Sequence, residues 1–530
     1  MKGWIKMQKK KIVAAVLSAA MITGMVTGCN GDNTTTSSAP ETTTTVTGNP
    51  DAELESSVDW NDMANSGGEV DEADEAGTGE LYEPGKKAGA VKALCYYDLA
   101  QTQPELAELL ATRFGGTIET VSSQSGSLYF EKLATLVASD DSPDIVRYDW
   151  MAYPWGVSQN LFTPLDGWLD MDDPFWSDEK SVIESFAYAG KHYYFPTAVQ
   201  TNFAMIYNTN NIELAGLEDP YELYMKGEWT WDTFERLATE WANRDEENIG
   251  FTGGSWSSMM FINTTGTKVI DMTGTDIVNN MKNENVQRTM DWIAKMKNDG
   301  LIGDGFIDPG LAFVDGKLLF LGMGLTWGFE SAQQSLFKND LPGEIVALPF
   351  PRDPQADKYY ISADSYGFMV PAGAKNVQGG VQWILCGRIH ETDPEIIQAT
   401  QEELMYDGPN YFPKCAGCKY DFVESGEHRT LDSCPECNEP RKAKFKPVYS
   451  QEQIDINESM RDPEKFGLIF DSTVGFSSDF SDLFVGAEET IFDGPLYYGT
   501  SYTQLRDSKF GAVESYLEPI RQVIRQAASE

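Results

Sequence analysis

The apolar positions of the folded region follow two alternating periods along the chain, one typical of strands and one typical of helices. The mostly apolar run at 90–97 predicts a buried strand, the β-branched residues of 117–121 predict a second strand after two glycines, and 144–146 begins a third. Between them, residues 104–114 and 130–137 place large apolar side chains three or four positions apart, which predicts amphipathic helices. This β-α-β-α-β order predicts an α/β fold with a mostly parallel sheet, and ligands of such sheets bind beyond the carboxyl ends of the strands.

The first 28 residues have the pattern of a targeting segment rather than that of a folded element. Five lysines precede an apolar stretch at 12–26 that is too short to span a bilayer but suits a signal peptide. It ends in Val26-Thr27-Gly28-Cys29, which resembles the bacterial lipobox and predicts lipidation of Cys29 as the mature N-terminus. The alternative is an ordinary signal peptide that contains a cysteine. The lipobox predicts a lipid anchor at the extracellular face of a bacterial cytoplasmic membrane.

Residues 29–87 have a different composition from the rest of the chain. Thr, Ser, Asn, Gly and Pro dominate the first part, acidic residues are added later, and no Lys or Arg occurs between 29 and 85. Such a segment buries too little apolar surface to offset its conformational entropy. We therefore predict a disordered acidic tether; a solvated loop within the fold is the alternative.

The remaining chain, 88–530, is longer than one hydrophobic core supports, which predicts two or three domains. The formal net charge is −42, and removal of the lysine-containing leader leaves −47. This charge repels nucleic acid and anionic lipid, and it weakly favours a neutral or cationic ligand. The chain has only three histidines, which leaves few candidates for a His-based catalytic triad.

Short motifs that follow one another in a fixed order between 90 and 395 resemble one family. The runs are SPDIV (142–146), LFTPLD (161–166), YFP (194–196), MIYN (205–208), AGL (215–217), WTWDTF (229–234), FVDGK (313–317), GLTW (324–327), LPFP (348–351) and GFMVP (367–371). No single run is specific. The ordered set resembles the extracellular solute-binding proteins of family 1, which feed carbohydrate ABC importers.

The resemblance implies a periplasmic-binding-protein-like α/β fold with two lobes joined by hinge-crossing strands. The expected parts are a signal peptide (1–28), the tether (29–87), the first part of lobe 1 (88–203), the first part of lobe 2 (204–356), a return to lobe 1 (357–398) and a C-terminal part that belongs mostly to lobe 2 (399–530).

The resemblance also implies a function without catalysis. A monomer would capture a carbohydrate, expected to be an oligosaccharide, and deliver it to the membrane subunits of an ABC importer. A peptide or a modified sugar is an alternative solute. Two other classes of protein stay open, a secreted carbohydrate-active enzyme and a cell-surface scaffold or adhesin. The sequence contains no nucleophile elbow, P-loop or HExxH motif.

A sugar presents C–H faces, which aromatic rings cover, and a rim of hydroxyls, which carboxylates and amides bind. From this chemistry and the matching family positions we predict seven ligand-binding residues: Trp150, Trp327, Asp149, Trp256, Asp364, Tyr366 and Asp98. Trp256 is expected as an exposed aromatic in a loop at 253–258. The alternative for each Trp is a core position, as we expect for Trp231 and Trp241 on a helix. Where many members of the family carry a carboxylate near the first crossing, this chain has Gln-Thr-Asn at 200–202, so the polar contact there is unassigned.

Four cysteines form two CxxC motifs, Cys415 with Cys418 and Cys434 with Cys437, separated by 15 residues. Because tight turns direct both thiolates of each motif at one tetrahedral ion, the spacing predicts a structural Zn²⁺ site in a zinc-ribbon-like insert at 411–440. Iron in a rubredoxin-like site, disulfides between the motifs and free thiols are alternatives, and an extracellular location favours the disulfides. The family pattern does not require this insert, and its role is open.

Overall fold

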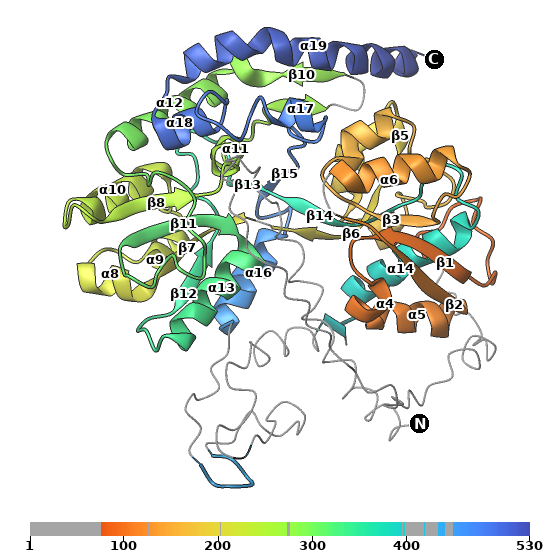
Figure 1. Ribbon diagram of the computed structural model, residues 1–530, viewed down its shortest axis with the longest axis horizontal. Coiled ribbons are helices and arrows are strands. Elements are labelled where there is room, and N and C mark those ends of the chain that lie inside the picture. The colour runs from red at the N-terminus through yellow and green to blue at the C-terminus, as the bar shows by residue number, and fades with distance from the viewer. Residues whose placement is uncertain are drawn as a thin grey trace, which may run out of the picture.

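The computed structural model describes residues 76–124, 127–201, 203–272, 276–394, 396–397, 418, 433–439 and 449–529. Within them the chain forms two α/β lobes that lie side by side, with strands crossing between them (Figure 1). The predicted signal peptide, Cys29, Cys415 and most of the predicted tether lie outside the described residues.

Lobe 1 is built on a five-stranded sheet. Its order is β2 (Gly116–Ser122), β1 (Gly89–Cys95), β3 (Ile145–Arg147), β14 (Asp364–Met369) and β6 (Phe195–Gln200). β1 pairs in parallel with β2 and β3, which confirms the predicted β-α-β-α-β order, whereas β14 is antiparallel to β3 and β6. The helices around it are α4 (Leu99–Thr102), α5 (Pro104–Phe114), α6 (Ser127–Ala138), α7 (Lys180–Ser185) and α14 (Val377–Thr392), with short helical turns η2 (Ala152–Gly156) and η3 (Pro174–Trp176).

The sequence of α5 shows why these elements begin and end where they do. Pro104 occupies the first turn, where its missing N–H has no intrahelical partner to lose. Leu106, Leu110 and Phe114 are buried against the sheet. Gly115 ends the helix in the left-handed region at φ 58°, a conformation that favours glycine.

Lobe 2 is built on a four-stranded sheet in the order β12 (Ile345–Leu348), β7 (Phe203–Asn208), β11 (Leu318–Gly324) and β8 (Ile249–Gly253). β11 is parallel to β8 and antiparallel to β7. The helices of this lobe are α8 (Thr209–Ala215), α9 (Pro220–Met225), α10 (Trp231–Ala242), α11 (Ser257–Asn263), α12 (Glu284–Asn298), α13 (Leu325–Lys338), α16 (Gln451–Met460), α17 (Ser478–Ser481), α18 (Asp493–Tyr498) and α19 (Tyr502–Ser529), with the turn η4 (Asn280–Lys282).

Two connections cross between the lobes, and a third segment, which begins with β15 (Gly467–Ile469), lies beside one of them. β6 leads into β7 through residues 201 and 202, and β13 (Tyr360–Ser362) leads into β14. β15 pairs in parallel with β13, and Ala363 donates its N–H to the carbonyl oxygen of Ile469 at 2.9 Å. Two smaller ribbons, β4 (Ala187–Tyr188) with β5 (Lys191–His192) and β9 (Ile270–Met272) with β10 (Ile277–Asn279), complete the strands.

Residues 470–476, which we call the bridging segment, contact both lobes. In lobe 2, Asn263 donates its side-chain N–H to Asp471 Oδ2 at 3.0 Å. In lobe 1, the backbone N–H of Trp155 donates to the carbonyl oxygen of Gly475 at 3.3 Å. The C-terminal part of the chain is therefore attached to both lobes.

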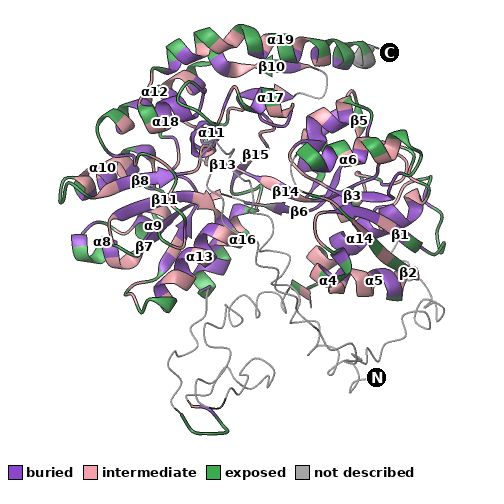
Figure 2. Cartoon of the chain, viewed as in Figure 1, coloured by how far each residue is buried: buried purple, intermediate pink, exposed green. Residues whose placement is uncertain are grey.

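The strands of both sheets are largely buried, whereas α19 exposes one side to solvent (Figure 2). Trp231 and Trp241 are buried, which confirms their predicted core positions, and the thiols of Cys95 and Cys386 are buried as well. None of the helices in the described part of the chain has the length and apolar character needed to cross a bilayer.

Candidate functional site

The ends of the strands bring an edge of one sheet close to an edge of the other. β6 ends at Gln200, which pairs with Asp364 at the start of β14. β7 begins at Phe203, which pairs with Gly324 at the end of β11. Because two residues separate β6 from β7, the two edges lie close together. The carboxyl ends of β1, β2 and β3 share the first edge, and that of β8 shares the second. We call them the lobe 1 edge and the lobe 2 edge.

All seven predicted ligand residues lie at these two edges. Asp98, Asp149, Trp150, Asp364 and Tyr366 lie at the lobe 1 edge, and Trp256 and Trp327 lie at the lobe 2 edge. They come from loops after strands and from the crossing strand β14. The edges of α/β sheets at which strands end are the usual place for a ligand.

An aromatic pair lies at the lobe 2 edge. Trp327 is in the first turn of α13, and its ring stacks on that of Phe306, with 6.2 Å between centroids and 24° between planes. Phe306 is 48% exposed, and Trp327 is partly buried. The sequence analysis missed Phe306, although a large apolar residue in a loop rich in Gly and Asp is a detectable signal.

Trp256 differs from its expected setting. It lies at the N-cap position of α11 rather than in an open loop, and its partly buried ring packs against the hydrophobic core. The helix begins there because the backbone N–H of Ser257 donates to the carbonyl oxygen of Gly254 at 2.9 Å, which closes a turn directly after β8. The turn at 254–256 agrees with the expected loop, but the ring of Trp256 is partly buried rather than exposed.

The loop after β3 carries Asp149 and Trp150, both partly buried. Burial raises the pKa of the Asp149 carboxyl, although the Arg147 guanidinium opposes the shift. Asp149 Oδ1 accepts a hydrogen bond from the backbone N–H of Trp150 at 2.7 Å. A Cβ on Gly475 would lie 2.7 Å from the carbonyl oxygen of Trp150, so the bridging segment packs closely against this loop.

Two of the predicted carboxylates have local structural partners. Asp98 is exposed and caps α4, since its Oδ1 accepts the backbone N–H groups of Ala100 at 3.0 Å and Gln101 at 3.3 Å. This capping accounts for Asp98 without a ligand. Asp364 is partly buried, and its Oδ1 accepts the N–H of Ser365 at 2.7 Å.

Tyr366 belongs to a cluster that the sequence analysis missed. The Arg147 guanidinium lies 5.1 Å from the ring centroid of Tyr96, 5.9 Å from that of Tyr97 and 5.4 Å from that of Tyr366. The hydroxyls of Tyr97 and Tyr366 are 3.2 Å apart. Burial raises the pKa of each of these three phenols, so they stay neutral. The available signal was the place of Tyr96, Tyr97 and Arg147 at the ends of two predicted strands.

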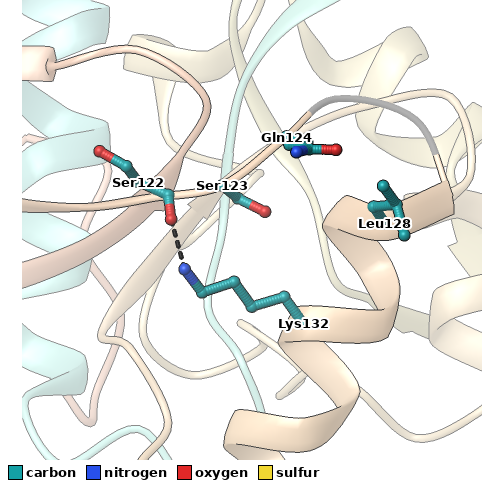
Figure 3. A pocket seen from close by; sticks show the side chains of 5 residues that line it. All are labelled: Ser122, Ser123, Gln124, Leu128 and Lys132. Carbon is teal, nitrogen blue, oxygen red and sulfur yellow. Dashed lines mark hydrogen bonds between the residues drawn. The ribbon is translucent and has the colours of Figure 1, made fainter.

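A hollow of about 430 Å³ continues the lobe 1 edge beyond β2 (Figure 3). Its lining is Ser122, Ser123, Gln124, Leu128 and Lys132. Ser122 pairs with Cys95 at the end of β1, so the hollow lies at the same sheet edge as the tyrosines that follow β1. Lys132 donates its ammonium N–H to the carbonyl oxygen of Ser122. The hollow therefore offers hydroxyl and amide groups beside the apolar Leu128 and the ammonium of Lys132.

Three of the four predicted metal ligands lie together. The Sγ atoms of Cys418, Cys434 and Cys437 are all within 4.8 Å of one another, which is close enough to bind one metal ion. Cys418 and Cys434 Sγ are 3.4 Å apart, longer than a disulfide bond of about 2.05 Å. Burial acts to raise the pKa of the Cys434 thiol, but hydrogen bonds from the backbone N–H groups of Cys437 and Glu436 outweigh it and hold the pKa at about 7. A thiol of this kind deprotonates readily, as a metal ligand must.

Two α/β lobes with crossing strands and a polar, aromatic junction define the two-lobed fold of periplasmic binding proteins. Residues 99–384 match the family described as bacterial extracellular solute-binding protein. This match spans more than half of the chain, so the chain belongs to that family.

Solved structures with low sequence identity share the fold. An ABC substrate-binding protein from Listeria monocytogenes in complex with cycloalternan is 14% identical, with a TM-score of 0.52, covering 81% of this chain and 99% of its own. The GacH receptor of Streptomyces glaucescens is 17% identical, with a TM-score of 0.51, over 81% and 98% of the two chains. UgpB from Mycobacterium tuberculosis, in complex with glycerophosphocholine, is 13% identical, with a TM-score of 0.51, over 81% and 99%. No curated protein sequence gives a significant match.

Proposed function

We propose that this protein captures a carbohydrate, of oligosaccharide size, between its two lobes and delivers it to an ABC importer without chemical change. The observation that carries the proposal is the aromatic surface at both sheet edges. Trp327 and Phe306 stack at the lobe 2 edge, and Trp150 and Tyr366 lie at the lobe 1 edge. Aromatic rings cover the C–H faces of sugars and need no charge to do so.

The polar groups near these rings suit the hydroxyl rim of a sugar. Asp149 and Asp364 supply carboxyl oxygens, and the hydroxyls of Tyr97 and Tyr366, which are bonded to each other, lie at the same edge. The hollow lined by Ser122, Ser123 and Gln124 gives room for a further ring along the same edge. We propose that Trp150, Trp327, Asp149, Trp256, Asp364 and Tyr366 contact the solute and that Asp98 shapes the rim as a helix cap.

The ligands of proteins with the same fold support a carbohydrate as the solute, but they do not determine which solute this protein binds. The Listeria protein holds cycloalternan, and the Streptomyces receptor was solved with acarbose. The Mycobacterium protein holds glycerophosphocholine instead. The fold therefore accommodates different polar solutes, and the choice depends on the side chains at the edges.

Incubation of the purified full-length protein with a panel of oligosaccharides tests the proposal and separates the three classes of function. Capture predicts saturable binding by calorimetry, one ligand per chain, a raised melting temperature and unchanged sugar by chromatography. Hydrolysed sugar would show a carbohydrate-active enzyme. Absence of both binding and turnover across the panel would leave a surface scaffold or adhesin and would contradict the proposal.

We further propose that the protein works as a monomer, lipid-anchored at Cys29 on the extracellular face of the cytoplasmic membrane, with residues 29–87 as a tether. Delivery to the membrane subunits of an importer then requires reach from the bilayer, which a flexible segment of this length provides. Size-exclusion chromatography with light scattering tests the monomer.

A second proposal concerns the cysteines. We propose that Cys415, Cys418, Cys434 and Cys437 hold one structural Zn²⁺. The support is the sequence spacing, the proximity of three Sγ atoms and the lowered pKa of Cys434. Iron would fit the same four thiolates. Four protein ligands leave no open position, so the ion stabilises the insert and takes no part in capture.

A further inference from the structure

One side of the Arg147 guanidinium has no hydrogen-bonding partner in the described part of the chain. Nη1 donates to the carbonyl oxygen of Tyr148 at 3.1 Å and contacts the hydroxyl of Tyr96. Nε is buried without a partner; Nη2 also lacks one among the described residues, but it is not closed off from solvent. Nε–H and one Nη2–H lie parallel on the same side of the planar group. Such a fork matches two oxygens of a carboxylate, sulfate or phosphate.

The Arg147 cation has no direct ionic partner among the described residues, although its surroundings hold the pKa above its ordinary value despite burial. The residue is only 8% exposed, and its hydrogen bonds within the described part of the chain go to Tyr96 and Tyr148, with no carboxylate among the acceptors. Three tyrosine rings surround the guanidinium and stabilise the cation in part. Asp149 interacts electrostatically with Arg147 without a hydrogen bond to it, and burial raises the Asp149 pKa against that interaction. A buried cation without an ionic partner destabilises a fold unless something else pairs with it.

The position of this charge points to a ligand rather than to the core. Arg147 is the last residue of β3, Tyr96 and Tyr97 follow the last residue of β1, and Tyr366 is on the crossing strand β14. The guanidinium therefore lies across the lobe 1 edge. It belongs to the same sheet edge as Trp150 and Tyr366, which the proposed function uses.

We infer that the Nε and Nη2 side of Arg147 receives an anionic group of the solute, so that the protein selects acidic carbohydrates bearing a carboxylate, sulfate or phosphate ester. This inference rests on the proposed function and names its substrate class. It runs against the net charge of −42, whose field repels anions in solution. A buried guanidinium acts at contact distance, where little water screens it, and so opposes that field locally.

The first arm of the test uses anions without sugar. Sodium sulfate, sodium phosphate and sodium galacturonate are titrated into the full-length protein against sodium chloride at equal ionic strength, with melting temperature and tyrosine fluorescence as readouts. We expect at least one anion to give a saturable change that Arg147→Gln abolishes. Arg236→Gln is the matched control, because Arg236 lies on the surface of lobe 2 in exposed ion pairs with Glu218 and Glu240. It should respond as the unmodified protein does.

The second arm uses pairs of sugars that differ only in charge. The pairs are trigalacturonate with its methyl ester, a sulfated with an unsulfated galactose oligosaccharide, and glucose 6-phosphate with glucose. The acidic member of the preferred pair should bind roughly 10- to 100-fold more tightly, as a charged hydrogen bond provides. Arg147→Gln should abolish that preference, and Arg147→Lys should retain part of it because Lys keeps the charge but lacks the fork. The preferred pair identifies the anionic group.

The outcomes separate this inference from the proposed function. If neutral sugars bind as tightly as their acidic partners and Arg147→Gln weakens both equally, carbohydrate capture stands and the selection of anions is wrong. If no sugar binds but anions act through Arg147, the anion site stands and carbohydrate capture is contradicted. If neither arm shows an effect of charge, the inference is wrong, and the role of Arg147 is structural, through its hydrogen bonds to Tyr96 and Tyr148. Should Arg147→Gln fail to fold, the preference of the unmodified protein between paired sugars decides.

Discussion

The indole of Trp327 lies against the ring of Phe306, with 6.2 Å between their centroids and 24° between their planes. Phe306 comes from the loop that follows α12, and Trp327 comes from the first turn of α13. Two stacked rings hold each other in place, so the pair offers a rigid aromatic surface at the lobe 2 edge. Rigidity matters for capture because a side chain that is already ordered loses little entropy when a ligand binds.

Replacement of Trp327 by Ala should weaken sugar binding by about 2–4 kcal/mol, or roughly thirty- to a thousand-fold. The melting temperature without ligand should fall little, because the ring is only partly buried. Trp150→Ala should behave in the same way. Trp231→Ala is the contrasting control, since Trp231 is 5% exposed and stacks on Trp292 at 4.5 Å. It should lose about 3–5 kcal/mol of stability and bind normally when folded. Loss of stability with normal binding in both test variants would place Trp150 and Trp327 in the core.

Gly475→Ala should disturb the loop that carries Trp150. A Cβ at this position would lie 2.4 Å from the carbonyl oxygen of Tyr153 and 2.7 Å from that of Trp150. We expect a loss of about 1–3 kcal/mol of stability, together with weaker sugar binding. Gly511→Ala, in α19, meets no atom within 4 Å and should stabilise the helix by about 0.5–1 kcal/mol with unchanged binding. Equal binding by the two variants would show that the bridging segment does not position this loop.

The stability of lobe 2 should depend on pH through Glu330. This carboxyl is 6% exposed, accepts a hydrogen bond from the Tyr449 hydroxyl at 3.1 Å, and burial raises its pKa to about 7. The folded protein therefore binds a proton that the unfolded chain releases near its ordinary pKa. Stability is full below that ordinary pKa and falls as the pH rises to about 7, by roughly 3 kcal/mol for this group.

Glu330→Gln should remove that fall, so the variant should gain stability over the unmodified protein at pH 8 and little at pH 4. Urea unfolding at a series of pH values measures the difference between the two proteins. The buried Glu179, whose pKa is also raised to about 7 by burial, titrates in both and cancels from this difference. A constant difference across the series would show that Glu330 has an ordinary pKa.

Purified protein should contain about one Zn or Fe per chain by elemental analysis. Cys434→Ser, or a strong chelator, should remove the ion and increase hydrogen exchange at 410–440, while both lobes keep their melting transition because each has its own core. Mass spectrometry that finds two intact disulfides and no metal would refute the metal site.

Cys29→Ser should release the protein from membranes or block processing of its leader, because the sulfur that receives the lipid is gone. Fractionation of cells that express the variant, with immunodetection in membrane and soluble fractions, measures this. A variant that stays in the membrane fraction in processed form would contradict the lipid anchor.

The sequence was most informative where structure follows from neighbouring residues. The strands and helices between 89 and 147 were predictable because their apolar periodicity is local, and the edge position of Trp150 and Trp327 followed from family motifs at strand ends. The capping role of Asp98 was also visible in principle, since it depends on N–H groups two and three residues ahead.

The rest depends on contacts between distant segments. Phe306 and Trp327 meet only when two loops of lobe 2 pack together. The cluster around Arg147 needs β1, β3 and β14 in one sheet, with Tyr366 more than two hundred residues away in sequence. Trp256 carried the same local signal as an exposed loop residue, but packing against the core decided its burial. Periodicity does not report such contacts.

The bridging segment has a geometric consequence for how the two lobes can move. Atoms that keep their contacts with both of two rotating bodies must lie near the axis of rotation. Asp471 is bonded to lobe 2 and Gly475, four residues later, is bonded to lobe 1, so an axis that keeps both bonds passes close to this short segment. The sheet order places β2 three strands away from β14, or roughly 14 Å at the usual strand spacing. On the lobe 1 edge, the hollow at Ser122 is therefore the part farthest from the axis. A rotation of one lobe against the other would displace the wall around a long solute most at this point.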